Sequence, residues 1–359
     1  MKRTPEAVGR ENLESIVGLQ QKIIPEMRDL LEKRYELLKH ISYHGPIGRR
    51  ALAAQMDLSE SGIRNDIRIL KETGMLEMSL LGVTVTPAGR EVIAKLRRYV
   101  NAMHGLLATE RDLEQKLAIP MVKIVPGDSE KEECVLQELG RVTARVLDNL
   151  LKPGMVVGVS GGSTMAAVAG AVRGRMPDIL VVPTRGGLGE QVERQANSVA
   201  VAMAGNLGGN YRLLHIPEGI NDAAMRSIRD MDSSIGEIEA LIQSADILIH
   251  SIGRADVMVH RRNHAPEVAS DICRRGAGEA LGHYYSADGE CIHTYSTNGF
   301  RLDNLAGIGK TIAVAGGKQK AAAVVSVIKA NSRDVLVIDE AAARAIQLII
   351  QAEGSQKTF

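Results

Sequence analysis

A polar turn near the middle of the chain has the residue types and spacing of a phosphate-binding loop. The apolar run 155–159 is followed by Ser160, Gly161, Gly162, Ser163 and Thr164, and then by small helix-forming residues. This order predicts a strand, a tight turn and a helix, which together aim backbone N–H groups and a helix N-terminus at an anion. We therefore expect Gly161, Gly162, Ser163 and Thr164 to bind a phosphate.

Two common nucleotide motifs do not fit this turn. No lysine follows Gly162 as a Walker A loop requires, and the glycine spacing departs from the dinucleotide fingerprint. After the next predicted strand, 179–182, comes Arg185, where an NAD-binding sheet carries an acidic residue for the ribose. An arginine favours a phosphate there, because its planar fork binds phosphate in two places. The sequence thus disfavours a dehydrogenase.

Three further polar side chains belong to the same predicted edge. Gln195 precedes the predicted helix 196–207, and its amide, like that of Asn197, suits sugar hydroxyls. Glu279 stands among glycines and alanines at 276–282, where a carboxylate suits sugar hydroxyls; the alternative is an exposed loop acid. Lys320 follows a second glycine pair, at 316–317, and adds positive charge for a phosphate. Two glycine turns with Arg185 and Lys320 predict one phosphorylated ligand.

The segment 260–264 offers two interpretations. His260 and His264 are four residues apart, the spacing of two metal ligands on a helix, but no acidic residue stands between them. Arg261 and Arg262 lie between the histidines, and an arginine reaching a second phosphate is the interpretation we favour. We expect no metal and no cofactor.

The elements that must position these residues form a repeating pattern. Strands are predicted at 121–125, 155–159, 179–182, 211–216, 247–250, 312–315 and 335–338. Helices are predicted between or after them, at 130–151, 196–207, 234–244, 318–330 and 340–351. Such alternation predicts a parallel α/β sheet of Rossmann-like type, whose ligands sit beyond the carboxyl ends of the strands. A hairpin is expected around Asp288-Gly289.

The first third of the chain has a different pattern. Helical periodicity covers 11–41 with a break at Pro25, followed by predicted helices from about 49 to 56 and from Ser59 to about 73. Two short strands around Gly82 and a long helix from 88 to 117 complete the pattern. Helix, turn, helix and wing in this order predict a winged helix-turn-helix.

The polar face of the second helix suits duplex DNA. We expect contacts from the exposed positions of this module: Arg49, Arg50, Ser59, Ser61, Arg64, Asn65 and Arg68. Arginine reads guanine or phosphates, and asparagine can pair with adenine. The alternative is a solvated face of a helical hairpin. We place the domain boundary after residue 118, with a DNA-binding domain at 1–118 and an α/β ligand-binding domain at 119–359.

Bulk composition fits a soluble globular protein. The 359 residues are 45% hydrophobic and 24% charged, with a net charge of +1 and three cysteines. No apolar run approaches the length of a transmembrane helix, and no apolar signal core follows the N-terminus. Few, odd and widely spaced cysteines indicate reduced thiols, so we expect a cytoplasmic protein without membrane partners.

These motifs together resemble the SorC/DeoR-type sugar-sensing transcription regulators over nearly the whole chain. The specific pieces are Lys33-Arg34-Tyr35-Glu36, Pro46-Ile47-Gly48-Arg49-Arg50, Gly161-Gly162-Ser163-Thr164, Arg185-Gly186-Gly187-Leu188-Gly189-Glu190 and Gly316-Gly317-Lys318-Gln319-Lys320. The resemblance implies a repressor of glycolytic genes. It also implies an effector domain similar to sugar-phosphate isomerases and deaminases, with fructose 1,6-bisphosphate as inducer. It maps the family's ligand contacts onto Gly161, Gly162, Ser163, Thr164, Arg185, Gln195, Glu279 and Lys320.

Two functions remain open at this point. The first is a homo-oligomeric DNA-binding repressor, dimer or tetramer, that a phosphorylated sugar releases from its operator. The second is a sugar-phosphate isomerase or deaminase with an accessory DNA-binding head. Asp256 is a poor candidate for its general base, because Arg254 stands where those enzymes keep paired acids. We therefore favour a regulator without catalytic residues.

Overall fold

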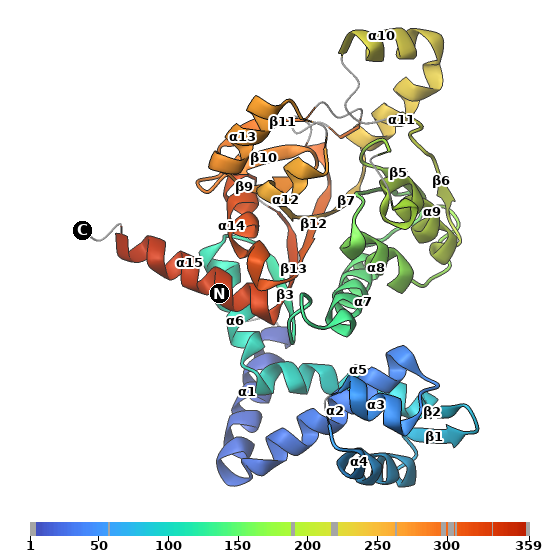
Figure 1. Cartoon of the computed structure of the whole chain (residues 1–359), viewed down its shortest axis with the longest axis vertical. Coiled ribbons are helices and arrows are strands. Elements are labelled where there is room, and N and C mark those ends of the chain that lie inside the picture. The colour runs from blue at the N-terminus through green and yellow to red at the C-terminus, as the bar shows by residue number, and fades with distance from the viewer. Residues whose placement is uncertain are drawn as a thin grey trace. The chain divides into compact units, whose positions relative to one another are not determined.

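The computed structural model describes residues 5–56, 58–187, 191–216, 222–262, 264–295, 299–300, 305, 307–331 and 333–356 (Figure 1). Asp57 in the predicted turn and residues 188–190 in the motif after Arg185 lie outside this described part. The chain divides into two compact units, Met1–Ala108 and Thr109–Phe359, and each is described by itself.

The first unit is mainly helical. Its helices are α1 (Pro5–Ile23), α2 (Glu26–His44), α3 (Arg49–Gln55), α4 (Glu60–Glu72) and α5 (Pro87–Met103). The predicted break at Pro25 is confirmed, since this residue separates α1 from α2. Strands β1 (Leu76–Ser79) and β2 (Gly82–Val85) form an antiparallel hairpin between α4 and α5. The turn of this hairpin is Leu80-Leu81, and Gly82, around which the turn was predicted, is the first residue of β2.

Local sequence signals begin and end α4. The Ser59 hydroxyl accepts a hydrogen bond from the Gly62 amide at 3.2 Å and caps the helix. Gly74 follows the helix with φ +76°, a conformation that favours glycine. Ile63, Ile67 and Leu70 bury the apolar face of α4 in a core shared with α2, α3 and the hairpin.

The long helix predicted from 88 to 117 is wrong in one respect. It is divided into α5 and α6 (Leu106–Lys116), with Gly105 between them at φ +70°. An apolar stripe continues through both helices, which is why periodicity alone does not detect the break. A left-handed glycine ends the first helix and lets the second begin in a new direction.

The second unit contains a seven-stranded sheet in which all neighbouring strands are parallel. Its strands are β3 (Met121–Val125), β4 (Val156–Val159), β5 (Leu180–Pro183), β6 (Asn210–Tyr211), β7 (Ile247–Ser251), β12 (Lys310–Ala315) and β13 (Val335–Asp339). The order across the sheet is β3-β13-β12-β7-β4-β5-β6. The predicted parallel α/β sheet is confirmed. The strand predicted at 211–216 is reduced to the two-residue β6.

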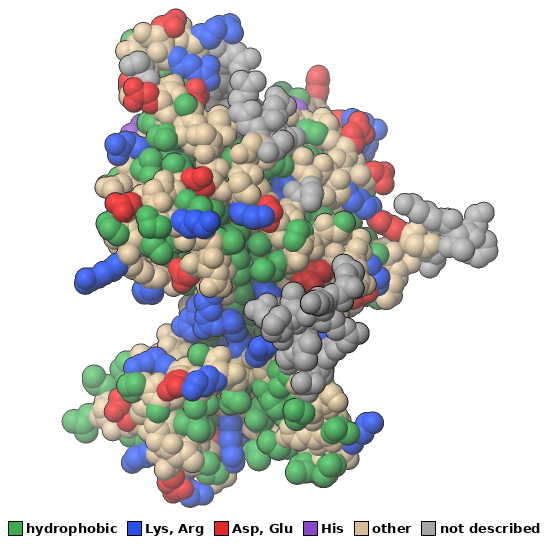
Figure 2. Space-filling model, turned by 180° about the vertical axis from the view of Figure 1, so that it is seen from behind, with side chains coloured by type: hydrophobic (Ala, Val, Ile, Leu, Met, Phe, Trp, Pro, Cys, Tyr) green, Lys and Arg blue, Asp and Glu red, His purple; other side chains and the backbone are tan. Residues whose placement is uncertain are grey.

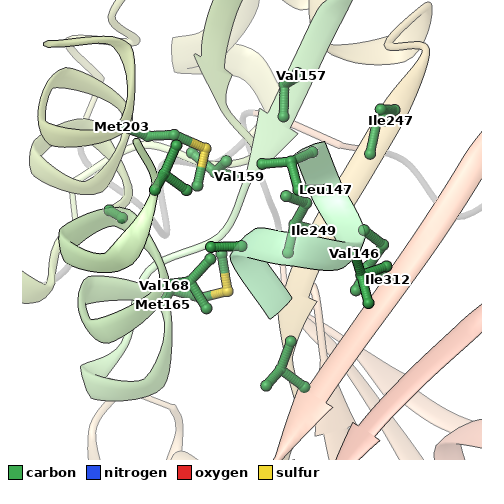
Figure 3. Close-up of a cluster of buried hydrophobic side chains, with 14 of the residues drawn as sticks. Val146, Leu147, Val157, Val159, Met165, Val168, Met203, Ile247, Ile249 and Ile312 are labelled. Atoms are coloured by element: carbon green, nitrogen blue, oxygen red, sulfur yellow. The ribbon is translucent and has the colours of Figure 1, made fainter. Parts of the chain in front are cut away.

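Helices alternate with the strands of this unit along the chain (Figure 1). They are α7 (Glu133–Leu150), α8 (Ser163–Ala171), α9 (Ala196–Leu207), α10 (Asp222–Met231), α11 (Ser233–Gln243), α12 (Ala255–His260), α13 (Pro266–Arg275), α14 (Ala321–Ala330) and α15 (Glu340–Gln356). Figure 3 shows one part of the core, where side chains of α7, α8 and α9 meet those of β4 and β7. Aliphatic side chains and methionines fill this core, which fixes the strand ends in space.

The edge strand β3 is covered by two carboxylates. Glu114 accepts a hydrogen bond from the Val122 amide at 3.0 Å, and Glu110 accepts one from the Ile124 amide at 3.0 Å. Both glutamates belong to α6. They satisfy amides on the side of β3 that has no neighbouring strand in the sheet.

A second, four-stranded antiparallel sheet lies beside the first. It consists of β8 (Gly253–Arg254), β9 (Gly276–Ala280), β10 (His283–Ser286) and β11 (Cys291–Thr294), in the order β11-β10-β9-β8. The hairpin predicted around Asp288-Gly289 is confirmed between β10 and β11, and Gly289 has φ +87°. The glycine-rich stretch from 276, which shows no strand signal in the sequence, forms β9.

Candidate functional site

A pocket of about 280 Å³ lies beyond the carboxyl ends of β4, β5, β7 and β12. These four strands are the middle of the sheet, the position at which open α/β sheets bind ligands. The lining residues come from the four segments that follow these strands, from α12 and from the second sheet: Ser160, Gly161, Gly162, Ser163, Thr164, Arg185, Ser251, Ile252, Gly253, Arg254, Val257, Met258, Arg261, Glu279, Leu281 and Lys320. Seven of the eight ligand residues named from the sequence are therefore brought together.

The first glycine turn needs both of its glycines. A Cβ on Gly161 would lie 2.6 Å from the carbonyl oxygen of Arg194, and Gly162 has φ +120°. The Gly162 amide donates to the Arg194 carbonyl oxygen at 2.7 Å. Helix α8 begins directly afterwards at Ser163. The turn therefore presents the N-terminus of α8 and the side chains of Ser163 and Thr164 to the pocket.

Two serines hold this turn to the neighbouring strand β7. The Ser160 hydroxyl accepts from the Ser251 amide at 3.1 Å, and the Ser251 hydroxyl donates to the Gly161 carbonyl oxygen at 3.2 Å. Sequence analysis assigned no role to Ser251. The signal that could have revealed it is its place at the carboxyl end of a predicted strand.

The pocket is strongly cationic. Arg185, Arg254, Arg261 and Lys320 line it together with a single carboxylate, that of Glu279. Arg254 donates to Asp256 at 3.0 Å and also bonds Gln319. Burial lowers the pKa of Lys320, although the negative charges of Asp339 and Glu130 act to raise it. An anion in the pocket would favour the charged form of this lysine.

Glu279 is not the exposed loop acid that the alternative interpretation described. It lies on β9 and is only 4% exposed. Its Oε1 accepts from Arg262 at 2.9 Å and from the Gly282 amide at 2.7 Å. Burial alone would raise the pKa of Glu279, but the charges of Arg262 and Arg185 outweigh it and hold the pKa below its ordinary value. The carboxylate is therefore ionised at the pocket wall.

The two arginines of the 260–264 segment have different positions. The Arg262 side chain is fully buried, paired with Glu279, and lies over the rings of Tyr284 and Tyr295 at 5.6 and 5.3 Å. The Arg262 guanidinium is therefore engaged by Glu279 inside the protein, whereas Arg261 lines the pocket. His264 bonds the Tyr284 hydroxyl at 3.0 Å. No cluster of three metal-ligating side chains occurs among the described residues.

The second glycine turn supports the site without lining it. The Gly317 amide donates to Asp339 Oδ2 at 2.6 Å, and the same oxygen accepts from the amide and hydroxyl of Ser129 at 2.9 and 2.6 Å. Of this turn and the following residues, only Lys320 lines the pocket. The expectation that both glycine turns line the site is met by the first turn alone, because Gly316 and Gly317 are absent from the pocket lining and the second turn contributes Lys320.

Gln195 does not line the pocket, although it lies next to the first glycine turn. Its backbone carbonyl carbon is 3.3 Å from the Cβ position of Gly161. Asn197 has a structural contact, because its amide exchanges two hydrogen bonds of 3.1 Å with the backbone of Leu214.

The residues named for DNA contact lie on and beside α3 and α4. Arg49, Arg50, Ser59, Ser61, Arg64, Asn65 and Arg68 are all exposed. Arg64 pairs with Glu60 at 3.4 Å, and Arg68 donates to Glu72 at 2.9 Å and to Asn65 at 3.1 Å. Ser59 serves as the N-cap of α4.

Comparison with known protein families gives two matches. Residues 101–347 match the family described as "Putative sugar-binding domain", and residues 30–100 match "CggR N-terminal DNA binding domain". The described residues contain no helix long and apolar enough to cross a membrane.

The chain is also similar to named regulators. It is 36% identical to the "Central glycolytic genes regulator" of Priestia megaterium, over 93% of this chain and 98% of that protein. The identity is also 36% with the protein of the same name in Bacillus subtilis, over 93% and 99%. A solved structure described as "the putative SorC family transcriptional regulator from Enterococcus faecalis" shares 36% identity, with a TM-score of 0.62 over 67% of this chain and 99% of that one. The full-length sorbitol operon regulator SorC of Klebsiella pneumoniae shares the fold, with a TM-score of 0.63 at 19% identity over 85% and 94%.

Proposed function

The chain belongs to the SorC-type family of sugar-binding transcriptional regulators, and from that premise we propose that it is a repressor of glycolytic or other sugar-metabolism genes. Its effector is a phosphorylated sugar, with fructose 1,6-bisphosphate as the first candidate. The observation that carries the proposal is the pocket, in which a helix N-terminus, four cationic side chains and one ionised carboxylate converge. The relatives named above are transcriptional regulators, and the chain is a regulator rather than an enzyme.

In this proposal one phosphate binds Gly161, Gly162, Ser163 and Thr164 at the start of α8, with Arg185 and Lys320 adding charge. Glu279 accepts hydrogen bonds from sugar hydroxyls. Gln195 lies outside the pocket lining but next to the first glycine turn, and it adds a polar contact to a ligand that extends beyond the lining. Arg254 and Arg261 are the candidates for a second phosphate, because both line the pocket with positive charge. We also propose that this domain begins at residue 119 and that its fold is Rossmann-like and similar to sugar-phosphate isomerases and deaminases.

The N-terminal part, 1–118, would work as a winged helix-turn-helix. Here α4 enters the major groove, the hairpin β1–β2 is the wing, and Arg49, Arg50, Ser59, Ser61, Arg64, Asn65 and Arg68 contact operator DNA. The protein acts as a homo-oligomer, dimer or tetramer, in the cytoplasm. The effector releases the operator by shifting the population toward an arrangement whose heads no longer match the half-site spacing.

The effector is tested with Lys320→Met in the full chain. Because the substitution removes a cation from the pocket wall, fructose 1,6-bisphosphate should stabilise the parent against heat but stabilise the variant much less. At about one hundred times its dissociation constant, the ligand adds about 2.7 kcal/mol to the parent. Lys318→Met is the matched control, because Lys318 is exposed in the same turn and does not line the pocket. Equal stabilisation of parent and K320M would exclude Lys320 from the effector site, and no stabilisation of the parent would contradict the effector assignment.

DNA reading is tested separately, by mobility shifts without effector. Asn65→Ala should lose about 1–3 kcal/mol of discrimination at one base position. Arg49→Ala should weaken binding to all sequences alike and reduce the salt slope by about one. Lys71→Ala, an exposed change near the far end of α4, is the control. Unchanged affinity and specificity in both test variants would exclude α3 and α4 from the proposed DNA interface.

A further inference from the structure

Helix α1 is apolar on more of its circumference than its contacts inside the unit require. Val17 is buried and Leu13 half-buried against Ala102, Met103 and Leu107 at the end of α5 and the start of α6. Packing on one side of a helix requires one apolar stripe. A second apolar stripe on the same helix is ordinarily buried against another surface.

The second stripe is exposed. It runs along α1 and across the bend at Pro25 into α2, and its members are Ile16 (59% exposed), Leu19 (58%), Ile23 (78%), Ile24 (48%), Met27 (38%) and Leu30 (46%). We call these six residues the α1–α2 stripe. Figure 2 shows hydrophobic side chains gathered over this part of the first unit. Their exposed area is on the order of several hundred Å², the size at which an apolar patch marks an interaction site.

Five of the six residues of the α1–α2 stripe lie outside both domain matches, and Leu30 is the first residue of one of them. The DNA-binding family match begins at residue 30, and the sugar-binding match at residue 101, so all of α1 and the first turn of α2 precede both. The segment therefore adds an element to a DNA-binding module whose matched part has its own core, formed by α2, α3, α4 and the hairpin.

We infer that the α1–α2 stripe is the surface on which two copies of this chain pair through antiparallel α1 helices. A two-fold interface must be self-complementary, so it cannot place like charges against each other. The sequence of α1 meets this condition, because residues 15–24 carry a single charged side chain, that of Lys22. Centred near Leu19, the pairing sets Ile16 opposite Ile23 of the partner subunit.

Three further points favour a second copy as the occupant. A Cβ on Gly18 would meet nothing within 4 Å, so this position of α1 leaves room for a close neighbour. A single helix-turn-helix head reads one half-site, so stable operator binding requires two heads at a fixed spacing. A standard interface buries about 800 Å² per partner, and the α1–α2 stripe with its polar flanks approaches that size.

Cysteine crosslinking of the full chain tests the pairing. In a background with Cys134, Cys273 and Cys291 changed to serine, Leu19→Cys should give a covalent dimer on mild oxidation, because the two copies of residue 19 lie near the two-fold axis. Leu81→Cys is the control, an exposed leucine (79%) at the hairpin tip. Dimer yields no higher for L19C than for L81C would overturn the inference.

Opposite charges placed across the pairing give a second readout, which also determines the direction of the helices. Ile16→Glu or Ile23→Lys alone should weaken association about tenfold, because each puts a charge against an apolar side chain. The double variant should recover much of the loss, since antiparallel helices bring each introduced carboxylate beside an introduced ammonium group. In a parallel pair the same double variant would set like charges together and associate more weakly than either single variant.

Association is measured by sedimentation equilibrium without effector. All the substituted positions are exposed, so the monomer should fold normally, and Leu80→Lys at the hairpin tip (106% exposed) is the control that should associate as the parent does. Single variants that associate like L80K would exclude the α1–α2 stripe as the interface. A double variant weaker than both single variants would exclude the antiparallel arrangement.

Discussion

The ionised state of Glu279 depends mainly on Arg262, which lies behind the pocket wall. The carboxylate is buried, and Arg262, held between two tyrosine rings, compensates its charge from a position closed to solvent. The sequence presents these two residues seventeen positions apart with nothing to indicate that they pair. The pairing follows from the second sheet, whose strand β9 begins in a stretch of glycines that carries no strand signal.

We predict that Arg262→Met lowers the free energy of unfolding by about 3–5 kcal/mol, since it leaves Glu279 as an uncompensated buried charge. The double variant R262M/E279Q should be more stable than R262M, because the uncompensated charge is gone. Urea unfolding of the full chain measures both. Arg274→Met is the control, because Arg274 is 76% exposed and its pair with Asp271 should contribute no more than about 1 kcal/mol. A similar loss in R274M and R262M would refute the role given to the buried pair.

Most of the pocket lining, by contrast, could be predicted from single residues. Gly161, Ser163, Arg185 and Lys320 each stand directly after a predicted strand or within a turn of it, and parallel strands bring such positions to one edge. Met258 could not be assigned, because its type is common in any core. Side chains that act by position rather than by chemistry leave no mark in a sequence.

At the scale of elements, the two glycine turns look equivalent in sequence and differ in structure. The first opens α8 toward the pocket, whereas the second is fastened to Asp339 at the end of β13. Asp339 accepts four hydrogen bonds, the fourth from the Ala342 amide at 2.9 Å, and is completely buried. A turn motif fixes the backbone conformation, but the surrounding elements decide whether the turn lines a pocket.

We predict that Gly161→Ala abolishes stabilisation by fructose 1,6-bisphosphate, because the added Cβ would lie 2.6 Å from a carbonyl oxygen and displace the turn. The comparison is Gly170→Ala, in the helix that this turn opens, where a Cβ meets nothing within 4 Å. That change should stabilise the protein by about 0.5–1 kcal/mol, as alanine does in a helix. Thermal melts with and without ligand distinguish the two. Full ligand response in G161A would show that this turn is not the phosphate site.

The helices and strands of both units were largely predictable, because hydrophobic periodicity and capping residues are local signals. Two of the departures from prediction show how elements depend on context. A single residue, Gly105, divides one long amphipathic pattern into α5 and α6. The 211–216 segment is held by Asn197 through side-chain bonds instead of extending β6.

At the scale of the whole molecule, stability should depend on pH through a buried histidine. Burial, with the charge of Arg333, lowers the pKa of His250 from 6.5 to about 3. The Arg333 Nε–H donates to its Nε2 at 2.8 Å, so the neutral ring is the form that the fold accommodates. Between pH 6.5 and 3 the unfolded chain binds more protons at this residue than the folded chain.

We therefore predict that the free energy of unfolding falls as the pH drops below 6.5, with His250 contributing a slope of about 1.4 kcal/mol per pH unit. Above the ordinary pKa of histidine this contribution is constant. His250→Gln should flatten the acid side of the profile, whereas His215→Gln, at an exposed position, should leave it unchanged. Chemical denaturation from about pH 7.5 to about pH 4.5 measures the profiles on both sides of that pKa. Parallel profiles for parent and H250Q would show that another group governs the acid loss.

The glutamates along β3 have a consequence for how copies of this protein can meet. Their carboxylates occupy backbone amides that an approaching strand would need, and the opposite edge of the sheet ends in a strand of only two residues. Neither edge of this sheet offers a free strand with which a strand of another copy could pair continuously. Edge-to-edge joining of copies through this sheet is therefore disfavoured, and its borders act against fibrous aggregation.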